Sequence, residues 1–202
     1  MDNTIDPTNV IHLMGGKGVG KSSLALWFQY GEFIKAKAGV DWNSKTFEID
    51  PDTTLTIYIG VFREPIRHVE ALSPYFHVHR ALVLCDVMDR ASFDDAKLYF
   101  ESLNRYGRNA TLKVLICAKS DTIDPKTRVV SETEIEQLAS ENNAMLFTLS
   151  CLTGEGVDDC FGAVVSEISK QSSVSSSPKD VDASSSAPFP NEAPSPRFCT
   201  IC

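Results

Sequence analysis

The most constraining part of the sequence is the segment from Gly15 to Ser22, GGKGVGKS, which fits the spacing G-x-x-x-x-G-K-[ST]. The apolar run 10–14 precedes it, and residues 22–30 have the apolar spacing of a helix. A glycine-rich turn between a buried strand and a helix points backbone N–H groups at an anion, and the helix adds the positive end of its dipole. The sequence therefore predicts a phosphate-binding loop in an α/β fold.

Individual residues of this loop have separate expected roles. Lys21 is expected to reach the β and γ phosphates of a nucleotide, and Ser22 to offer its hydroxyl to Mg²⁺. A glycine-rich turn that precedes a helix by chance is the alternative, and the complete spacing argues against it. The residues expected to line the phosphate site are Gly15, Lys17, Gly18, Val19, Gly20, Lys21, Ser22 and Ser23.

Strand-like and helix-like segments alternate through the first 170 residues. Helices are predicted at 22–30, at 66–72, from Phe93, from Ser131 and at 157–168, and Ser92 with Asp95 and Ser131 with Glu134 have the spacing of capping pairs. Strands are predicted at 10–14, 42–49, 53–61, 81–85, 112–118 and 145–149. The pattern favours a mainly parallel six-stranded sheet with helices on both faces and an antiparallel hairpin, turning at residues 50–52, at one edge.

Composition divides the chain of 202 residues near Gln171. Residues 171–202 hold five of the ten prolines and nine serines, so we expect a disordered tail after a globular domain at 1–170. The net charge of −8 excludes the broad basic face that nucleic-acid binding needs. No apolar run approaches the length of a membrane span, and the polar start of the chain favours a cytosolic protein.

Cysteine and histidine spacing predicts neither a disulfide scaffold nor a metal site. Six cysteines are too few for such a scaffold. His77 and His79 have no further ligands at a suitable spacing, which argues against zinc. The cysteines that lie singly in apolar surroundings, as reduced core thiols do, are Cys85, Cys117, Cys151 and Cys160.

Short segments after the phosphate loop add to this pattern in a fixed order. They are GVDW at 39–42, LVLCD at 82–86, DRASF at 89–93, KSD at 119–121 and Ser150 after the last strand. Together with the loop they resemble the Ras-superfamily small GTPases, and among these the Rab proteins of vesicle traffic. The resemblance runs from about Val10 to Ile168. It implies a P-loop G domain that binds GTP or GDP with Mg²⁺, and partners that are effector and regulatory proteins of membrane traffic.

The base-reading elements of the family, N-K-x-D and S-A-K, are matched in part. The residues that the resemblance assigns to the guanine base are Lys119, Asp121, Ser150 and the backbone N–H of Cys151. Ala118 stands where the family has an asparagine that braces the pocket, and a buried polar contact of that kind is worth about 1–3 kcal/mol. We therefore expect relaxed specificity for the base.

The catalytic positions depart further from the family. Ile59 stands in place of the aspartate linked to Mg²⁺, Phe62 in place of the glycine that senses the γ phosphate, and Arg63 in place of the glutamine that orients water. Lys37 replaces the threonine that binds both metal and γ phosphate. We expect GTP hydrolysis to be weak or lost and Mg²⁺ to be weakly held. Lys17, Lys37 and Arg63 suggest metal-independent binding in a cationic pocket, and ordinary surface cations are the alternative.

The chain ends with two cysteines, Cys199 and Cys202. Cys199 fits C-a-a-X prenylation, and the pair fits the double geranylgeranylation of Rab proteins. Two lipids give lasting membrane attachment where one gives reversible binding. The expected location is the cytosolic face of an endomembrane, with a cytosolic pool; two thiols without a function are the alternative.

Two other classes of function are compatible with parts of the sequence. A nucleotide-independent scaffold that keeps the fold is favoured by Ala118 and Ile59 and opposed by the intact loop. A phosphate-loop kinase would need a catalytic acid or an arginine lid, and the sequence has no arginine-rich insertion.

Overall fold

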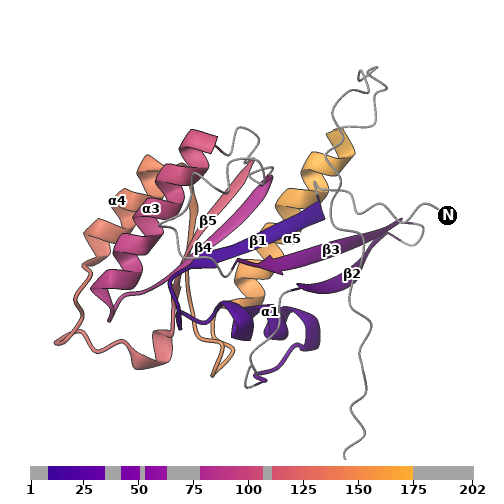
Figure 1. Ribbon diagram of the computed structural model, residues 1–202. Helices are drawn as coiled ribbons and strands as arrows, with labels where there is room; N and C mark the ends of the chain where they lie inside the picture. Colours follow the sequence, from indigo (N-terminus) through magenta and orange to yellow (C-terminus); the bar gives the residue numbers. More distant parts are fainter. Residues whose placement is uncertain (1–8, 35–41, 51–52, 63–77, 107–110, 175–202) are drawn as a thin grey trace, which may run out of the picture.

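The computed structural model describes residues 9–34, 42–50, 53–62, 78–106 and 111–174. Its centre is a six-stranded sheet in the order β2-β3-β1-β4-β5-β6 (Figure 1). All strand pairs are parallel except the edge pair β2–β3. The strands are β1 (Val10–Gly15), β2 (Trp42–Asp50), β3 (Thr53–Val61), β4 (Arg80–Asp86), β5 (Leu112–Ala118) and β6 (Met145–Leu149). The expected mainly parallel sheet with one edge hairpin is confirmed.

Helices cover both faces of the sheet, as predicted. On one face, α1 and α5 pack over a core that includes Leu24, Phe28 and Val164, and on the other face α3 and α4 pack over Phe93 and Ile135 (Figure 1). The helices are α1 (Lys21–Tyr30), α3 (Arg90–Tyr106), α4 (Glu132–Glu141) and α5 (Val157–Val174), with a 3-10 turn, η4 (Ser120–Thr122). Within the described ranges, no helix combines the length and the apolar character needed to cross a membrane.

The start of α3 corrects one prediction. The helix begins at Arg90, and Oδ1 of Asp89 accepts a hydrogen bond from the N–H of Ala91 at 3.0 Å, so Ser92 and Asp95 are not its capping pair. Ser92 is buried within the first turn, where its hydroxyl donates to the carbonyl oxygen of Asp86 at 3.0 Å. The spacing of Ser92 and Asp95 alone could not reveal this, because the residue that caps the helix is Asp89, three residues before Ser92.

The start of α4 matches its prediction. Oγ of Ser131 accepts from the N–H of Glu134 at 3.2 Å, and Oε2 of Glu134 accepts from the N–H of Ser131 at 3.0 Å. The helix expected at 66–72 and the hairpin tip at 51–52 lie outside the described residues. Helix α5 continues to Val174, and the remainder of the expected tail also lies outside them.

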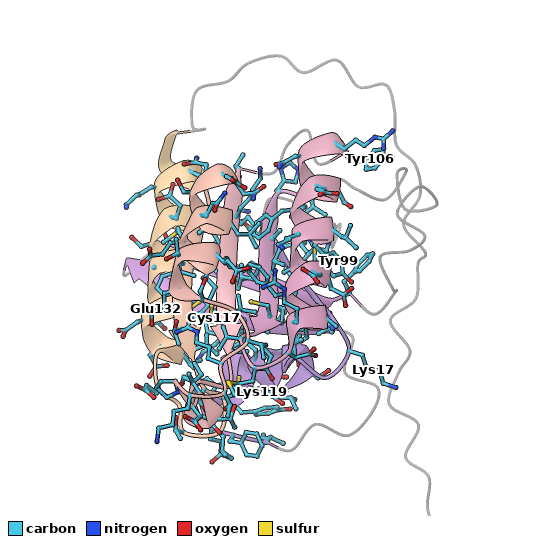
Figure 2. The ribbon with its side chains drawn as sticks, turned by 90° about the vertical axis from the view of Figure 1, so that its left-hand side faces the viewer. Lys17, Tyr99, Tyr106, Cys117, Lys119 and Glu132 are labelled. Atoms are coloured by element: carbon cyan, nitrogen blue, oxygen red, sulfur yellow. The ribbon has the colours of Figure 1, made fainter. Side chains whose placement is uncertain are left out.

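The order of the parallel strands positions the candidate site. Gly15 ends β1, Asp86 ends β4, Ala118 ends β5 and Leu149 ends β6, so the loops that follow them leave the same edge of the sheet. In open α/β sheets, ligands bind at this carboxyl edge. Figure 2 shows the labelled Lys17 and Lys119 at this end of the domain and Tyr106 at the opposite end.

Candidate nucleotide site

The phosphate loop has the backbone that its glycines allow. Gly15 has a φ of +138°, and a Cβ atom there would lie 2.4 Å from the carbonyl oxygen of Leu84. Gly20, with a φ of +107°, caps the N-terminus of α1. Any other residue at Gly15 would clash with β4, and both positions have a φ that L side chains rarely adopt. The predicted strand–loop–helix unit is thus present.

Lys21 reaches back across the loop. Its Nζ donates to the carbonyl oxygens of Gly15 and Gly16, each at 2.7 Å. This places a positive charge beside the N-terminus of α1, where the helix dipole also favours an anion. An open pocket at this point is lined by five of the predicted phosphate-site residues, Gly18, Gly20, Lys21, Ser22 and Ser23. Val19 turns its side chain into the core and is not part of this lining.

The two loops expected to read a base contact each other. The hydroxyl of Ser150, which is fully buried, donates to Oδ1 of Asp121. The same oxygen of Ser150 accepts from the N–H of Leu152 at 3.1 Å, which fixes the turn that contains Cys151. Asp121 itself is exposed and keeps a second carboxylate oxygen for a ligand.

Lys119 has a contact that sequence reasoning missed. It adopts a left-handed backbone with a φ of 63°, and its Nζ lies 2.9 Å from Oδ2 of Asp86 at the end of β4. Oδ1 of Asp86 accepts from the N–H of Met88 at 2.9 Å. Ala118 is buried in the core on the α1 and α5 face of the sheet, and its methyl side chain offers the site no polar atom. The sequence gives one indication of this contact: an acidic residue, Asp86, ends the apolar run of β4, and a basic residue, Lys119, directly follows that of β5.

Comparison with known proteins matches residues 10–170 to the Ras family. The chain belongs to the Ras family and is Rab-like. It is 30% identical over 177 residues to the GTP-binding protein YPT1 of Saccharomyces cerevisiae, covering 86% of this chain and 84% of that one. It is 31% identical over 159 residues to the Ras-related protein Rab-1 of Theileria annulata, covering 76% and 71%. With the human Ras-related protein Rab-26 it shares 29% identity over 167 residues, covering 80% of this chain and 64% of the relative.

In this Rab-like chain, the positions expected for catalysis are apolar where the structure describes them. Ile59 has no exposed surface and lies in the core between Ile11 of β1 and Asn43 of β2, its register partners. It supplies no oxygen to a metal. Among the described residues, no group of three or more His, Cys, Asp or Glu could hold a metal ion, and Ser22 is the predicted metal ligand at the pocket. Lys37 and Arg63 lie outside the described residues, as do Cys199 and Cys202.

Phe62 is anchored to the sheet and to α3. Its N–H donates to the carbonyl oxygen of Leu13 at 2.9 Å. Its ring packs edge-on against Tyr99, with centroids 6.5 Å apart and an interplanar angle of 90°. The Rab-like chain thus holds the end of β3 by an aromatic contact at the position where the resemblance places a glycine.

Helix α3 of the Rab-like protein also supports the phosphate loop. The Tyr99 hydroxyl is hydrogen-bonded to the backbone of Gly15, while burial, followed by the charge of Asp95, raises the pKa of Tyr99 to about 12. Oδ2 of Asp95 lies so close to Gly16 that a Cβ atom there would be 2.8 Å away. Sequence reasoning missed both contacts, although the i, i+4 spacing of Asp95 and Tyr99 put them on one face of the helix.

Proposed function

We propose that this protein is a Rab-like GTP-binding protein of vesicle-mediated membrane traffic, which binds GTP and GDP through its phosphate loop and hydrolyses GTP weakly or not at all. The observation that carries the proposal is the placement of two half-sites on one sheet edge. The pocket around Lys21 offers a cation and a helix N-terminus for phosphates. The Asp121–Ser150 pair offers a carboxylate for a base with adjacent N–H donors, such as guanine.

Weak hydrolysis is supported by the residues at the end of β3. Ile59 is buried and apolar, and Phe62 is packed against Tyr99. A family member that hydrolyses GTP needs a metal-linked carboxylate and a backbone that responds to the γ phosphate. Because the two nucleotides then make little differential contact with the protein, we expect similar structures in the GDP and GTP forms.

Weak dependence on Mg²⁺ is part of the same proposal. Ser22 is a single hydroxyl ligand, whereas Mg²⁺ in nucleotide sites is held by one or two carboxylates and by phosphates. Lys17 is an exposed cation within the loop and can supply part of the missing charge, as Lys37 and Arg63 would from segments outside the described residues.

Membrane attachment belongs to the proposal and is supported by sequence. Prenylation at Cys199 and Cys202 would hold the domain at the cytosolic face of an endomembrane. There it would recruit effector and regulatory proteins. Mass spectrometry of the protein from a eukaryotic cell tests this, because each geranylgeranyl group adds a fixed mass to the C-terminal peptide.

The decisive experiment is nucleotide titration of the purified protein by calorimetry, with Mg²⁺ and with EDTA. Binding of GDP and GTP with less than a tenfold loss in EDTA is the expected result. Lys21→Ala should abolish binding, whereas Lys170→Ala, which removes an exposed lysine on α5, should leave it unchanged. Loss of all nucleotide binding in EDTA would refute the proposal that binding is independent of Mg²⁺. Absence of any heat of binding both with Mg²⁺ and with EDTA would refute nucleotide binding itself.

A nucleotide-independent scaffold is the second candidate. The observation that favours it is the burial of two apolar residues, Ala118 and Ile59, where the family has polar ones. Extraction of small molecules from freshly purified protein separates the two, since a tight nucleotide-binding protein copurifies with its ligand and a scaffold does not.

A further inference from the structure

Two cysteines that the sequence places singly are neighbours in the sheet. Cys85 of β4 and Cys117 of β5 are register partners on adjacent parallel strands. Both belong to the core under α3 and α4, so both side chains point to the same face. Both are free thiols, with 0% and 2% of their surface exposed. The expectation of reduced core thiols holds for both, and their adjacency is an addition to it, because cysteine spacing in the sequence does not reveal strand register.

Their geometry is within reach of a disulfide. Adjacent strands lie about 4.8 Å apart. Disulfides join residues whose Cα atoms are about 4.4–6.8 Å apart and whose Cβ atoms are about 3.8 Å apart. Register partners on one face therefore need only a small approach of the two Cβ atoms to form an S–S bond. That approach strains the sheet, and strained disulfides are the more easily reduced ones.

The surroundings of the pair distinguish its two sulfur atoms. A hydrogen bond from Cys85 lowers the pKa of Cys117 against the opposing effect of burial, and the positive charge of Arg128 and a hydrogen bond from Thr148 lower it further. The same hydrogen bond, together with burial, raises the pKa of Cys85. Cys117 lies on β5, next to the edge strand β6, so it is the sulfur that an oxidant entering from that edge meets first, and Cys85 on β4 is placed to resolve the product.

Cys117 is buried but lies one strand in from the edge of the sheet. Its register partner on the edge strand β6 is Thr148, whose side chain is exposed. In the same core, the loop that follows η4 is held to Val87, the residue after β4, by hydrogen bonds of 3.3 and 3.2 Å from the N–H groups of Val129 and Val130 to its carbonyl oxygen. A molecule the size of hydrogen peroxide needs only a local opening at this edge.

We propose that Cys85 and Cys117 form a redox-sensitive thiol pair that a peroxide converts to a disulfide and a dithiol reduces again. The Cys117 thiolate attacks one peroxide oxygen, the O–O bond breaks, and after proton transfer the products are a sulfenic acid and water. The Cys85 sulfur then attacks the sulfenic sulfur, an S–S bond forms, and a second water leaves with the Cys85 proton. Two thiols lose two electrons in total, and these reduce one peroxide to two waters.

The disulfide would act on the candidate site because of its position. Asp86 and Ala118 directly follow the two cysteines and are themselves register partners, and Lys119 comes next. Drawing the strand ends together changes the 2.9 Å contact between Lys119 and Asp86. This consequence rests on the proposed nucleotide function; formation of the disulfide does not.

The test uses the full chain treated with hydrogen peroxide, denatured in N-ethylmaleimide and analysed by peptide mass spectrometry. The expected result is a peptide pair linked between Cys85 and Cys117 that dithiothreitol separates. Cys160→Ala removes a buried thiol on the opposite face and should leave the linkage unchanged. Cys85→Ala should remove the linkage and leave Cys117 as a sulfenic or sulfinic acid. Full alkylation of both cysteines after peroxide, or a link that joins Cys151 to Cys160 instead, would overturn the inference.

Release of fluorescent GDP supplies the second measurement. We expect oxidation to speed dissociation at least threefold in the parent protein and not in Cys85→Ala. An unchanged rate in a protein shown to carry the disulfide would overturn the regulatory part. Failure of the reduced protein to bind GDP would instead refute the proposed function, while the peptide result would still decide the thiol pair.

Discussion

The ammonium group of Lys119 lies 2.9 Å from Oδ2 of Asp86 and joins the loop after β5 to the end of β4. Asp86 makes two further hydrogen bonds: its backbone N–H donates to Oγ of Ser92 in α3 at 2.9 Å, and its Oδ1 accepts from the N–H of Met88 in the turn between β4 and α3. The ion pair therefore ties the expected base-reading loop to the start of α3. The ion pair thus links the two loops in a chain that has Ala118 at the position where the family resemblance places a pocket-bracing asparagine.

Asp86→Asn tests the energetic weight of this tie. Because the Lys119 side chain is 42% exposed, we expect a loss of only about 1 kcal/mol in the free energy of unfolding. A double-mutant cycle with Lys119→Met in urea denaturation should give a coupling energy of about 0.5–1 kcal/mol. Strictly additive effects would show that the contact contributes nothing.

Phe62→Ala tests the aromatic anchor at the end of β3. Removing a partly buried ring that packs edge-on against Tyr99 should cost about 2 kcal/mol of stability in urea denaturation. Tyr99→Phe keeps the ring contact and removes the hydroxyl that is hydrogen-bonded to Gly15, so it should cost about 1 kcal/mol. If the two variants were equally stable, the ring contact would not be the main contribution of Phe62.

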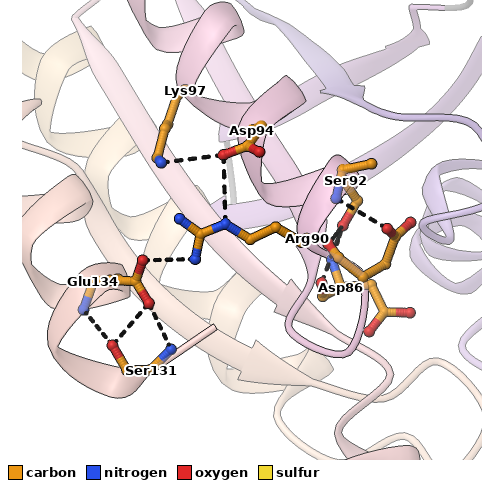
Figure 3. A network of polar contacts seen from close by, with 9 residues as sticks. Asp86, Arg90, Ser92, Asp94, Lys97, Ser131 and Glu134 are labelled. Carbon is orange, nitrogen blue, oxygen red and sulfur yellow. Dashed lines mark hydrogen bonds and ion pairs between the residues drawn. The ribbon is translucent and has the colours of Figure 1, made fainter. Parts of the chain in front are cut away.

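Ser131→Ala tests the capping box, which Figure 3 shows together with its link to α3. Arg90 donates from Nη1 to Oε1 of Glu134 at 2.6 Å, while Glu134 also closes the box with Ser131. Loss of an N-cap serine costs about 1 kcal/mol. Ser140→Ala, near the other end of α4, is the control and should change stability by less than about 0.5 kcal/mol. Equal losses in the two variants would argue against a capping effect.

The sequence carried enough information for elements whose signals are local. The apolar runs of β1, β4 and β5 and the spacing of Ser131 and Glu134 depend on residues close in the chain, and each was predicted within a residue or two. The phosphate loop was predictable for the same reason, because all its parts lie within eight consecutive residues.

The contacts that were missed depend on which strands become neighbours. The pairing of Cys85 with Cys117 and of Asp86 with Lys119 follows from the register of β4 and β5, which the intervening helix hides from any local pattern. Tyr99 and Asp95 reach the phosphate loop because α3 packs beside β1. Such contacts are set by tertiary packing rather than by propensity.

Stability should fall in two steps as the solution is acidified, and the first step belongs to His12. Burial lowers the pKa of His12 to about 4, so between pH 6.5 and 4 the unfolded chain binds a proton that the folded protein does not. The free energy of unfolding should therefore be about 2 kcal/mol lower at pH 5 than at pH 7.5.

The second step belongs to Glu134. Hydrogen bonds to Ser131 and Arg90 lower the pKa of Glu134 to about 2, so its contribution to stability is present above pH 4.5 and is lost as the pH falls towards 2. Urea midpoints measured across this range check both steps. His12→Gln should remove the first step and leave the second, and a His12→Gln protein that still lost the same stability by pH 5 would show that another group titrates there.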